Sequence, residues 1–512
     1  MGDNDVQVLV VGAGLGGLSA TLFLAQQGID VLGIAKHAST ALHPKATGQT
    51  PRTMELMRRA GVEDAVLAGS AGSIIIKVAE SLKGRVFTTI SPEDEDDAPD
   101  FAALSPAPFG MASQDHVEPV LLARARDLGA EVRFRTELVS FTQDENGVTA
   151  RLLDLPSGRL STVRADYLIA ADGHRGKIRG QLGIDRHGRG SLAGHIGIIF
   201  DADLTGHTVP GRSTLFYLRN EAFTGAFISL TTERRHVLTI EYHPERGESL
   251  ADYDEARCAD LIRVATDVPD LEPKILDITQ WEMAAWMADR FSSGRTFLIG
   301  DAAKVTPPTG GLGGNTAVQD GYDIAWKLAA VLKGEAGPEL LDSYEAERRP
   351  YAQAVVDTSY RNYVERFAPH LMGPDVPEPI DYLALGFGFR CRSAAVALED
   401  DDDTMENPHT PSGRAGYRAP HVLVEHDGAE VSTVDLFGRG WLLLTLDPAW
   451  NGCGVEVPVL TDPSGRLAAK YGIGDQGASL IRPDGVIAWR SKDLVLDPAA
   501  TVRRVLDSVL AR

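Results

Sequence analysis

The sequence predicts an α/β protein in three parts: an N-terminal βαβ unit, a middle region of antiparallel strands and a small α/β domain at the C-terminus. Three observations lead to this prediction. An apolar strand runs directly into a glycine cluster and a helix, short alternating strands fill about 194–242, and strand and helix patterns resume after a Pro-rich stretch at 408–411. At roughly 150 residues per domain, a chain of 512 residues also suggests about three domains.

The N-terminal unit begins with the strand pattern Val6–Val11, continues with a helix and returns to a strand at 29–34. Between the first strand and the helix stand Gly12, Gly14 and Gly17, in the spacing Gly-x-Gly-x-x-Gly. Gly12 allows a tight turn, Gly14 lets the backbone approach a pyrophosphate, and Gly17 lets helix and strand pack closely. In this context the motif predicts a nucleotide-cofactor site; the alternative is a tight turn that happens to contain glycines.

The acid that usually binds the ribose is missing from the end of the second strand. Ala35 takes the position where an acidic residue is expected, and Lys36 follows it. This departure weakens the expected ribose contact but leaves the phosphate cradle in place. Lys36 is a candidate contact for the adenosine part of a cofactor, although a surface lysine is an equally good interpretation.

Two further motifs follow predicted strands. Asp172-Gly173 places a carboxylate at a cleft, although such a pair alone is more often a simple turn. In the run 300–315, Asp301 can accept hydrogen bonds from sugar-type hydroxyls, two prolines stiffen the loop, and the glycines admit a flat ligand against the backbone. The helix predicted from Thr316 would present its positive N-terminal end to a ligand that becomes anionic.

Composition excludes several classes of partner. Lys and Arg total 50 against 72 Asp and Glu, a formal net charge of −22, so neither nucleic acid nor anionic membrane is expected. The nearly uncharged stretch 6–25 has the length of a membrane span, but its glycines favour strand, turn and helix. Cys258, Cys391 and Cys453 lie far apart, which predicts no zinc or dithiol motif and suits a cytoplasmic protein.

Taken together, in this order and with these separations, the three motifs resemble those of the FAD-dependent aromatic hydroxylases, which share the para-hydroxybenzoate hydroxylase fold. The segment 45–55 (Lys-Ala-x-Gly-Gln-x-Pro-Arg-Thr-Met-Glu) and the unusual Lys304 narrow the resemblance to hydroxylases that tailor aromatic polyketides, such as the aklavinone hydroxylases of anthracycline biosynthesis. The resemblance covers the whole chain.

The resemblance implies three domains. A Rossmann-like FAD-binding domain would comprise 1–184 and 285–395, and an antiparallel-sheet substrate domain would be inserted at 185–284. A thioredoxin-like domain without redox cysteines would occupy 396–512, after a boundary at the acidic run 399–403.

The expected FAD contacts combine these motifs with positions that the resemblance implies. They are Gly12, Gly14, Gly17, Lys36, Lys45, Arg52, Gln114, Asp172, Asp301, Pro308, Gly310, Gly311, Leu312, Gly313, Gly314 and Asn315. One further departure from the family pattern is Gly176, which stands where Ser is common.

The implied activity is hydroxylation of a phenolic polycyclic polyketide, an anthracyclinone such as aklavinone, with NADPH and O2 through a flavin hydroperoxide. A cation beside the substrate would favour its phenolate. Arg390 is the preferred candidate over Arg392, and Tyr217 and Pro308 are further expected substrate contacts. The alternatives are ion pairs at the surface or between domains for the arginines, and a core position for the tyrosine.

Other functions on the same fold stay open at this level. A Baeyer–Villiger oxygenation would use the same cofactors, and a non-enzymatic FAD-binding chaperone or sensor would share the motifs. A flavin halogenase is disfavoured, because Trp281 and Trp286 do not form the expected Trp-x-Trp-x-Ile-Pro motif.

Overall fold

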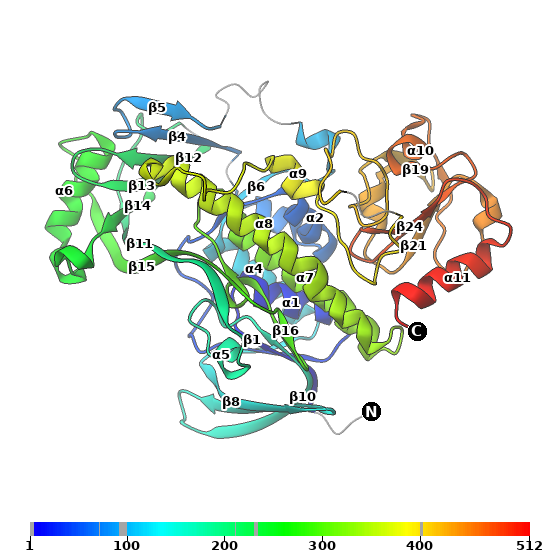
Figure 1. Cartoon of the computed structure of the whole chain (residues 1–512). Helices are drawn as coiled ribbons and strands as arrows, with labels where there is room; N and C mark the ends of the chain where they lie inside the picture. Colours follow the sequence, from blue (N-terminus) through cyan, green and yellow to red (C-terminus); the bar gives the residue numbers. More distant parts are fainter. Residues whose placement is uncertain (1–4, 71, 92–99, 210, 230–233, 400–402) are drawn as a thin grey trace.

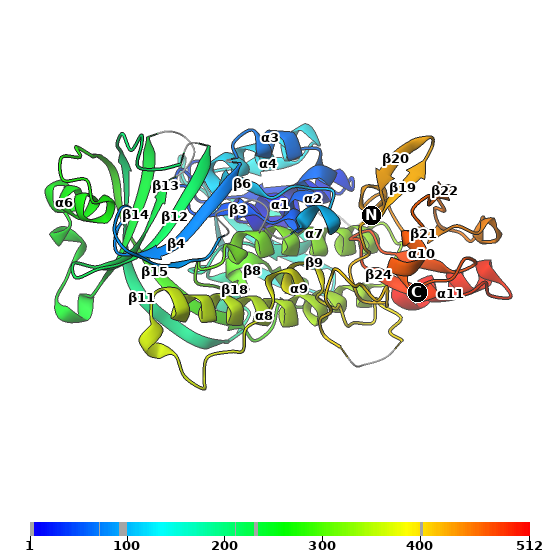
Figure 2. The same ribbon diagram turned by 90° about the horizontal axis from the view of Figure 1, so that it is seen from above.

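The chain forms an elongated molecule with three regions side by side. The structure, a computed structural model, describes residues 5–70, 72–91, 100–209, 211–229, 234–399 and 403–512; positions 400–402 of the acidic run lie outside this description. A strongly twisted sheet lies at one end, a parallel sheet with helices lies in the middle, and the C-terminal residues lie at the other end (Figures 1 and 2).

The central sheet is built on the predicted βαβ unit. Strand β1 pairs in parallel with both β2 and β10, and each of its last four residues is buried, as expected for a strand covered on both faces. The sheet order is β16 (Ser292–Ser293), β17 (Thr296–Leu298), β10 (Leu160–Ala170), β1 (Val6–Val11), β2 (Val31–Ile34) and β7 (Glu131–Arg133), with β8 (Thr136–Asp144) and β9 (Gly147–Asp154) extending β10.

Helices cover the central sheet and enclose its core. The apolar α1 is buried along nearly its whole length because it packs between the sheet and α7. The helices of this region are α1 (Leu15–Gln26), α2 (Pro51–Ala60), α3 (Glu63–Leu67), α4 (Gln114–Asp127), α5 (Ile178–Gln181), α7 (Leu312–Leu332), α8 (Asp342–Arg366) and α9 (Tyr382–Phe387). A small sheet of β3 (Thr47–Gln49) and β6 (Gly110–Ser113) joins them.

The second sheet is mostly antiparallel and draws on more of the chain than 185–284. Its order is β18 (Lys304–Val305), β15 (Lys274–Ala288), β11 (Arg186–Asp201), β14 (Arg235–Tyr242), β13 (Thr224–Ser229), β12 (Arg212–Arg219), β4 (Ser73–Ala79) and β5 (Val86–Thr89). Strand β4 pairs in parallel with β12, a long-range contact that sequence spacing does not reveal. Helix α6 (Glu255–Thr266) packs against one face, and α8 reaches the other.

Helix α7 begins four residues earlier than expected. Its N-cap is Gly311 rather than a residue near Thr316, so Gly313 and Gly314 lie inside its first turn. Glycine is a poor helix former, but here close packing overrides propensity, because a Cβ at Gly314 would lie 3.0 Å from Leu15 and 3.3 Å from Ala46.

The C-terminal residues form two three-stranded sheets with helices. The sheets are β20 (Ala429–Ser432), β19 (Leu423–His426) and β22 (Leu460–Thr461), and β21 (Leu442–Thr445), β23 (Ala478–Ile481) and β24 (Ile487–Ser491); the helices are α10 (Arg466–Tyr471) and α11 (Pro498–Val509). Among the helices described in the structure, none is both long enough and apolar enough to cross a membrane.

Candidate active site

Two glycines of the first motif, Gly12 and Gly17, leave room only for backbone. Gly12 has a φ of +116°, and a Cβ there would lie 2.0 Å from the carbonyl oxygen of Ala171 on the neighbouring strand. A Cβ at Gly17 would lie 1.9 Å from the carbonyl oxygen of Gly12. Gly14 is the N-cap of α1 and provides no side-chain cap. The start of α1 therefore has no cap from its own N-cap residue, and the Glu118 carboxylate of α4 lies beside the Leu15 amide. Unpaired amides at such a helix start can bind a pyrophosphate.

The neighbouring strand ends place Ala35, Lys36 and Asp172 around this turn. Ala35 is buried at the end of β2, whereas Lys36 is exposed and its charge acts on the Asp172 carboxylate. Asp172 accepts a hydrogen bond from the amide of Ile178 at 3.1 Å, and burial raises its pKa. A Cβ at Gly176 would lie 2.2 Å from the Asp172 carboxyl carbon, so a larger residue there would require the Asp172 side chain to move.

The second glycine loop leads from Asp301 to the start of α7. Gly310 and Gly311 both have positive φ, +119° and +65°, and Gly311 caps α7 without a side chain. Pro308 is exposed beside them, and its carbonyl oxygen accepts the Gly311 amide at 3.2 Å. Helix α7 therefore presents a second uncapped N-terminus, with Leu312, Gly313 and Gly314 in its first turn.

Asn315 fastens this loop to the segment before α2. Its side-chain oxygen accepts the amide of Thr50 at 2.9 Å, and its nitrogen donates to the carbonyl oxygens of Gly48 (3.0 Å) and Gly311 (2.7 Å). The Asn315 side chain thus makes its hydrogen bonds with the protein backbone. Its role is to fix the shape of the loop against which a flat ligand would lie.

Asp301 stands at the rim of this loop with its side chain exposed. Desolvation by the surrounding protein raises its pKa, while the charges of Lys304, His174 and Lys45 oppose the change. The exposed Lys45 also acts on Glu118, so it lies between two carboxylates. Gln114, at the start of α4, donates its amide to Glu118 at 2.6 Å.

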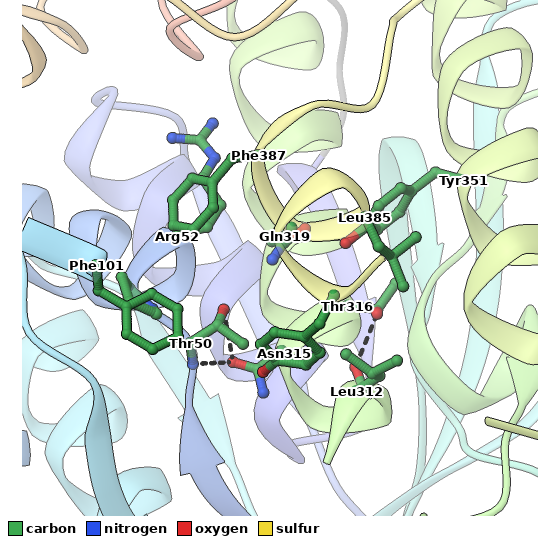
Figure 3. A pocket seen from close by; sticks show the side chains of 13 residues that line it. Thr50, Arg52, Phe101, Leu312, Asn315, Thr316, Gln319, Tyr351, Leu385 and Phe387 are labelled. Atoms are coloured by element: carbon green, nitrogen blue, oxygen red, sulfur yellow. Dashed lines mark hydrogen bonds between the residues drawn. The ribbon is translucent and has the colours of Figure 1, made fainter. Parts of the chain in front are cut away.

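Arg52 points toward the C-terminal residues. Its guanidinium bonds Glu55 and the backbone oxygen of Asp484, both at 2.7 Å. It also lines a small pocket, which Figure 3 shows beside the start of α7. The pocket walls are Thr50, Pro51, Arg52, Phe101, Leu312, Asn315, Thr316, Gln319, Tyr351, Tyr382, Leu385, Gly386 and Phe387.

Tyr217 lies on the face of the second sheet that meets α8. Its hydroxyl accepts a hydrogen bond from Arg366 at 3.1 Å, and the guanidinium carbon stands 5.4 Å from the Tyr217 ring centre. Arg366 also donates to Asn362 at 3.2 Å, and Asn362 donates to the carbonyl oxygen of Thr309 at 3.3 Å. This series of hydrogen bonds connects Tyr217 to the loop that carries Pro308.

Arg390 lies in a different environment. It is buried, donates from Nε to the carbonyl oxygen of Ala415 at 3.0 Å, and stacks over Tyr417 at 5.2 Å. Arg392 is half-buried in the same segment, between α9 and the C-terminal strands. The structure brings Tyr217 together with Arg366 rather than with either arginine, so their predicted substrate contacts stay predictions.

These features together define the class of protein. Residues 5–359 match the family described as "FAD binding domain", and residues 412–512 match "Aromatic-ring hydroxylase, C-terminal". The chain belongs to the FAD-binding aromatic-ring hydroxylases, and it is an FAD monooxygenase.

Particular relatives can then be named. The chain is 47% identical, over all of both chains, to aklavinone 12-hydroxylase RdmE of Streptomyces purpurascens. It is 54% identical to aklavinone 12-hydroxylase DnrF of Streptomyces peucetius, over 88% of this chain and 93% of that one. A crystal structure of aklavinone-11 hydroxylase with FAD and aklavinone matches it with a TM-score of 0.95, at 47% identity over the whole of both chains.

The residues present fit FAD. Two helix N-termini have no side-chain cap, both are reached through glycine turns, and the turn at Gly12 has no room for a Cβ. A pyrophosphate would lie at α1, and a flat ring system would lie against the backbone before α7. Asp301 remains the candidate for the sugar-type hydroxyls between them.

Sequence reasoning missed Arg366 and Asn362. Their spacing of four residues places them on one face of a predicted helix, which is a usable signal. No local pattern says that this face meets Tyr217, because the contact joins residues 149 positions apart.

Proposed function

We propose that this protein hydroxylates a phenolic ring of a polycyclic aromatic polyketide, an anthracyclinone such as aklavinone. The overall change consumes the phenol, O2, NADPH and one proton, and yields the hydroxylated phenol, water and NADP+. FAD supplies the redox and oxygen chemistry when bound, and the protein supplies orientation, charge and exclusion of water.

The observation that carries this proposal is the Tyr217–Arg366 pair. Tyr217 itself is buried, so a phenolic substrate placed between the second sheet and the loop at Thr309 would meet the half-buried Arg366, whose guanidinium also bonds the Tyr217 hydroxyl. A nearby cation favours the phenolate, and the phenolate activates the ring toward an electrophilic oxygen. The names of the relatives and the aklavinone bound in the solved structure support this substrate class.

The C-terminal residues are proposed to form a thioredoxin-like domain with a structural role. The antiparallel order β21-β23-β24 and the flanking helix α11 support that assignment. Cys453 is buried in the same core, which does not favour thiol chemistry there.

The direct test is incubation with FAD, NADPH or NADH, O2 and a panel of anthracyclinones and angucyclinones. We expect substrate-dependent oxidation of NADPH and a product heavier by one oxygen. Product NMR then decides the outcome: a new phenol on the ring supports the proposal, whereas oxygen inserted into a carbon–carbon bond would establish Baeyer–Villiger oxygenation instead.

A pair of variants tests which arginine serves the substrate. Arg366→Ala should lower kcat roughly 100-fold or more, because the phenolate loses its cation. The phenol pKa then rises, so the pH profile of kcat should move toward higher pH. Arg366→Lys should recover part of the rate. Arg390→Ala should leave that pH profile unchanged; the reverse pattern would assign the role to Arg390.

A further inference from the structure

In dinucleotide-binding folds an acid at the end of the second strand commonly binds the ribose of the adenosine half, and this chain has Ala35 where that acid is expected. Ala35 is buried at the end of β2, so it can offer no polar contact. The segment that follows it, residues 36–46, includes the exposed Lys36 and Lys45. Its last residue, Ala46, lies near Leu15 at the start of α1, since both would contact a Cβ at Gly314. A fixed carboxylate in this part of the site must therefore come from another element.

Glu118 on α4 reaches this place from the other side. Its Oε2 accepts the backbone amide of Ala41 at 2.7 Å, a contact between residues 77 positions apart. Its Oε1 accepts the Gln114 amide at 2.6 Å and stands 3.7 Å from the position that a Cβ of Gly14 would take. Glu118 is only 1% exposed, so its carboxylate makes these contacts in a buried position.

The surroundings favour a carboxylate that serves the cofactor site rather than the core. Burial raises the pKa of Glu118, while the amides of Ala41 and Leu15, the Gln114 side chain and the charge of Lys45 stabilise its ionised form. Leu15 is the first residue of α1, and the charge of Lys45 acts on both Glu118 and Asp301. Three parts of the FAD site therefore meet at one side chain.

We propose that Glu118 is the positioning acid of the adenosine half of the FAD site. Its carboxylate ties Ala41 to the start of α1, and this contact sets the course of residues 36–46 beside the place of the pyrophosphate. It thereby supplies from α4 a fixed carboxylate beside the adenosine half, where the end of β2 has none. The inference rests on membership of the FAD-binding family and not on the proposed substrate.

The test measures the affinity of the apoprotein for FAD, with flavin fluorescence as the signal of binding. Glu118→Ala should weaken binding roughly 10- to 100-fold, because it removes a charge-assisted acceptor of a buried amide. Glu118→Gln should fall between, about threefold to tenfold weaker, because it keeps an acceptor for Ala41. Asp127→Ala, an exposed acid on the same helix, is the matched control and should bind FAD as the wild type does.

Limited trypsin digestion of the apoproteins provides a second readout that needs no cofactor. Cleavage after Lys36 and Lys45 should be fastest in Glu118→Ala and slowest in the wild type. In the Glu118→Ala background, Ala35→Glu should recover FAD affinity at least threefold. FAD binding within twofold of the wild type by Glu118→Gln, or by a folded Glu118→Ala, would overturn the proposal; if Glu118→Ala does not fold, Glu118→Gln alone decides.

Discussion

At the scale of single residues, the turn at the start of α1 requires glycines because it has no room for Cβ atoms. Gly12 meets two constraints at once: its φ of +116° is disfavoured for any L side chain, and its missing Cβ would overlap the Ala171 carbonyl. Gly17 has the same steric limit against Gly12 itself. These glycines are required by backbone contacts, not by flexibility.

Gly12→Ala should therefore cost several kcal/mol of stability, about 3 or more, because neither backbone nor neighbour can yield without moving a strand. Thermal unfolding monitored by circular dichroism, together with FAD retention on purification, measures the effect. Gly180→Ala is the control, since a Cβ there meets nothing within 4 Å and its φ is not positive. Equal melting temperatures for the two variants would contradict this explanation.

At the scale of elements, α7 is anchored from below by a buried ion group. Asp320 accepts the amide of Gly300 at 3.1 Å and binds Lys304 and, at 2.8 Å, Arg348. Burial would raise the pKa of Asp320, but the charges of Lys304 and Arg348 outweigh it and hold the pKa below its ordinary value. One carboxylate thus connects the strand end before Asp301 to both long helices.

Asp320→Asn should lower the free energy of unfolding by about 3–5 kcal/mol, because it leaves two buried cations without their counter-charge. Denaturant unfolding gives the number, and FAD titration should show weaker binding because the Gly300–Asp301 turn loses its support. Glu335→Gln, at an exposed position after α7, should change neither. A loss below about 1 kcal/mol would mean that the ion group is dispensable.

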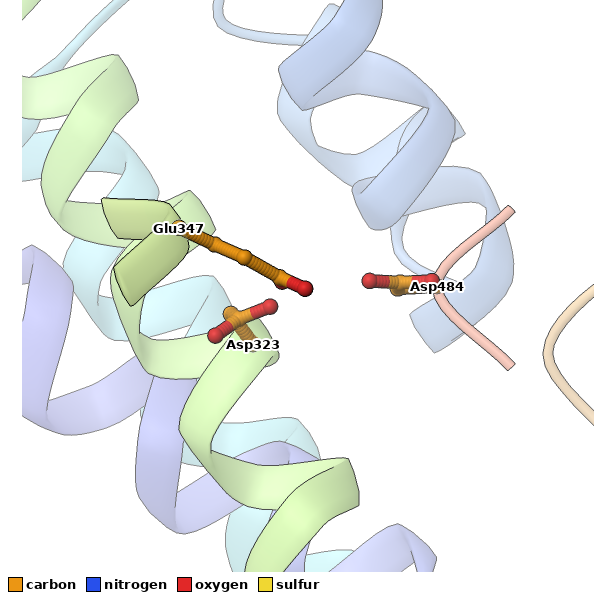
Figure 4. A group of neighbouring side chains, drawn as sticks. All are labelled: Asp323, Glu347 and Asp484. Atoms are coloured by element: carbon orange, nitrogen blue, oxygen red, sulfur yellow. The ribbon is translucent and has the colours of Figure 1, made fainter. Parts of the chain in front are cut away.

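At the scale of the whole molecule, the turn between β23 and β24 joins the C-terminal residues to the FAD domain. Arg482 binds Glu347 of α8 at 2.6 and 2.8 Å and also pairs with Asp484, and Lys327 binds both Asp323 (2.8 Å) and Glu347 (3.0 Å). Figure 4 shows the three carboxylates converging from α7, α8 and this turn. The two cations hold these oxygens, so the cluster is a junction between domains.

The carboxylates of Asp323, Glu347 and Asp484 outnumber the two cations that bond them, Lys327 and Arg482. This excess of negative charge affects the pKa of Asp323. Burial, opposed by Lys327 and reinforced by Glu347, raises the pKa of Asp323 to about 6. Because the folded state holds this proton more tightly than the unfolded chain, the contribution of Asp323 to stability is full below about pH 4 and is lost as pH rises to about 6.

The wild type should therefore lose unfolding free energy on the order of 3 kcal/mol as pH rises, and Asp323→Asn should not show this loss. The measurement is the difference in unfolding free energy between wild type and variant from pH 4 to pH 7, which should favour the variant increasingly as pH rises. Taking the difference cancels the carboxylates that do not interact with Asp323. Glu347 does interact with it, but its lowered pKa keeps it ionised across this pH range. A constant difference across this range would show that Asp323 titrates normally.

Prediction from the sequence succeeded where local pattern and chain order decide the structure. The strand Val6–Val11, the glycine turn between Gly12 and Gly17 and the helix that follows it were predictable, because burial periodicity and backbone geometry depend on consecutive residues. The start of α7 was not, because packing of Gly314 against Leu15 overrode helix propensity. The extent of the second sheet was not, because β4 reaches β12 across more than 130 residues.

The sequence by itself determined the family of cofactor and the class of enzyme, because the three motifs are local and their order is fixed along the chain. Only the tertiary structure decided which side chains meet: Arg366 beside Tyr217, Glu118 at the start of α1, and Arg482 against Glu347. Each of these contacts joins segments far apart in the chain, and only the packing of helices and sheets in the folded protein brings such polar groups within hydrogen-bond distance.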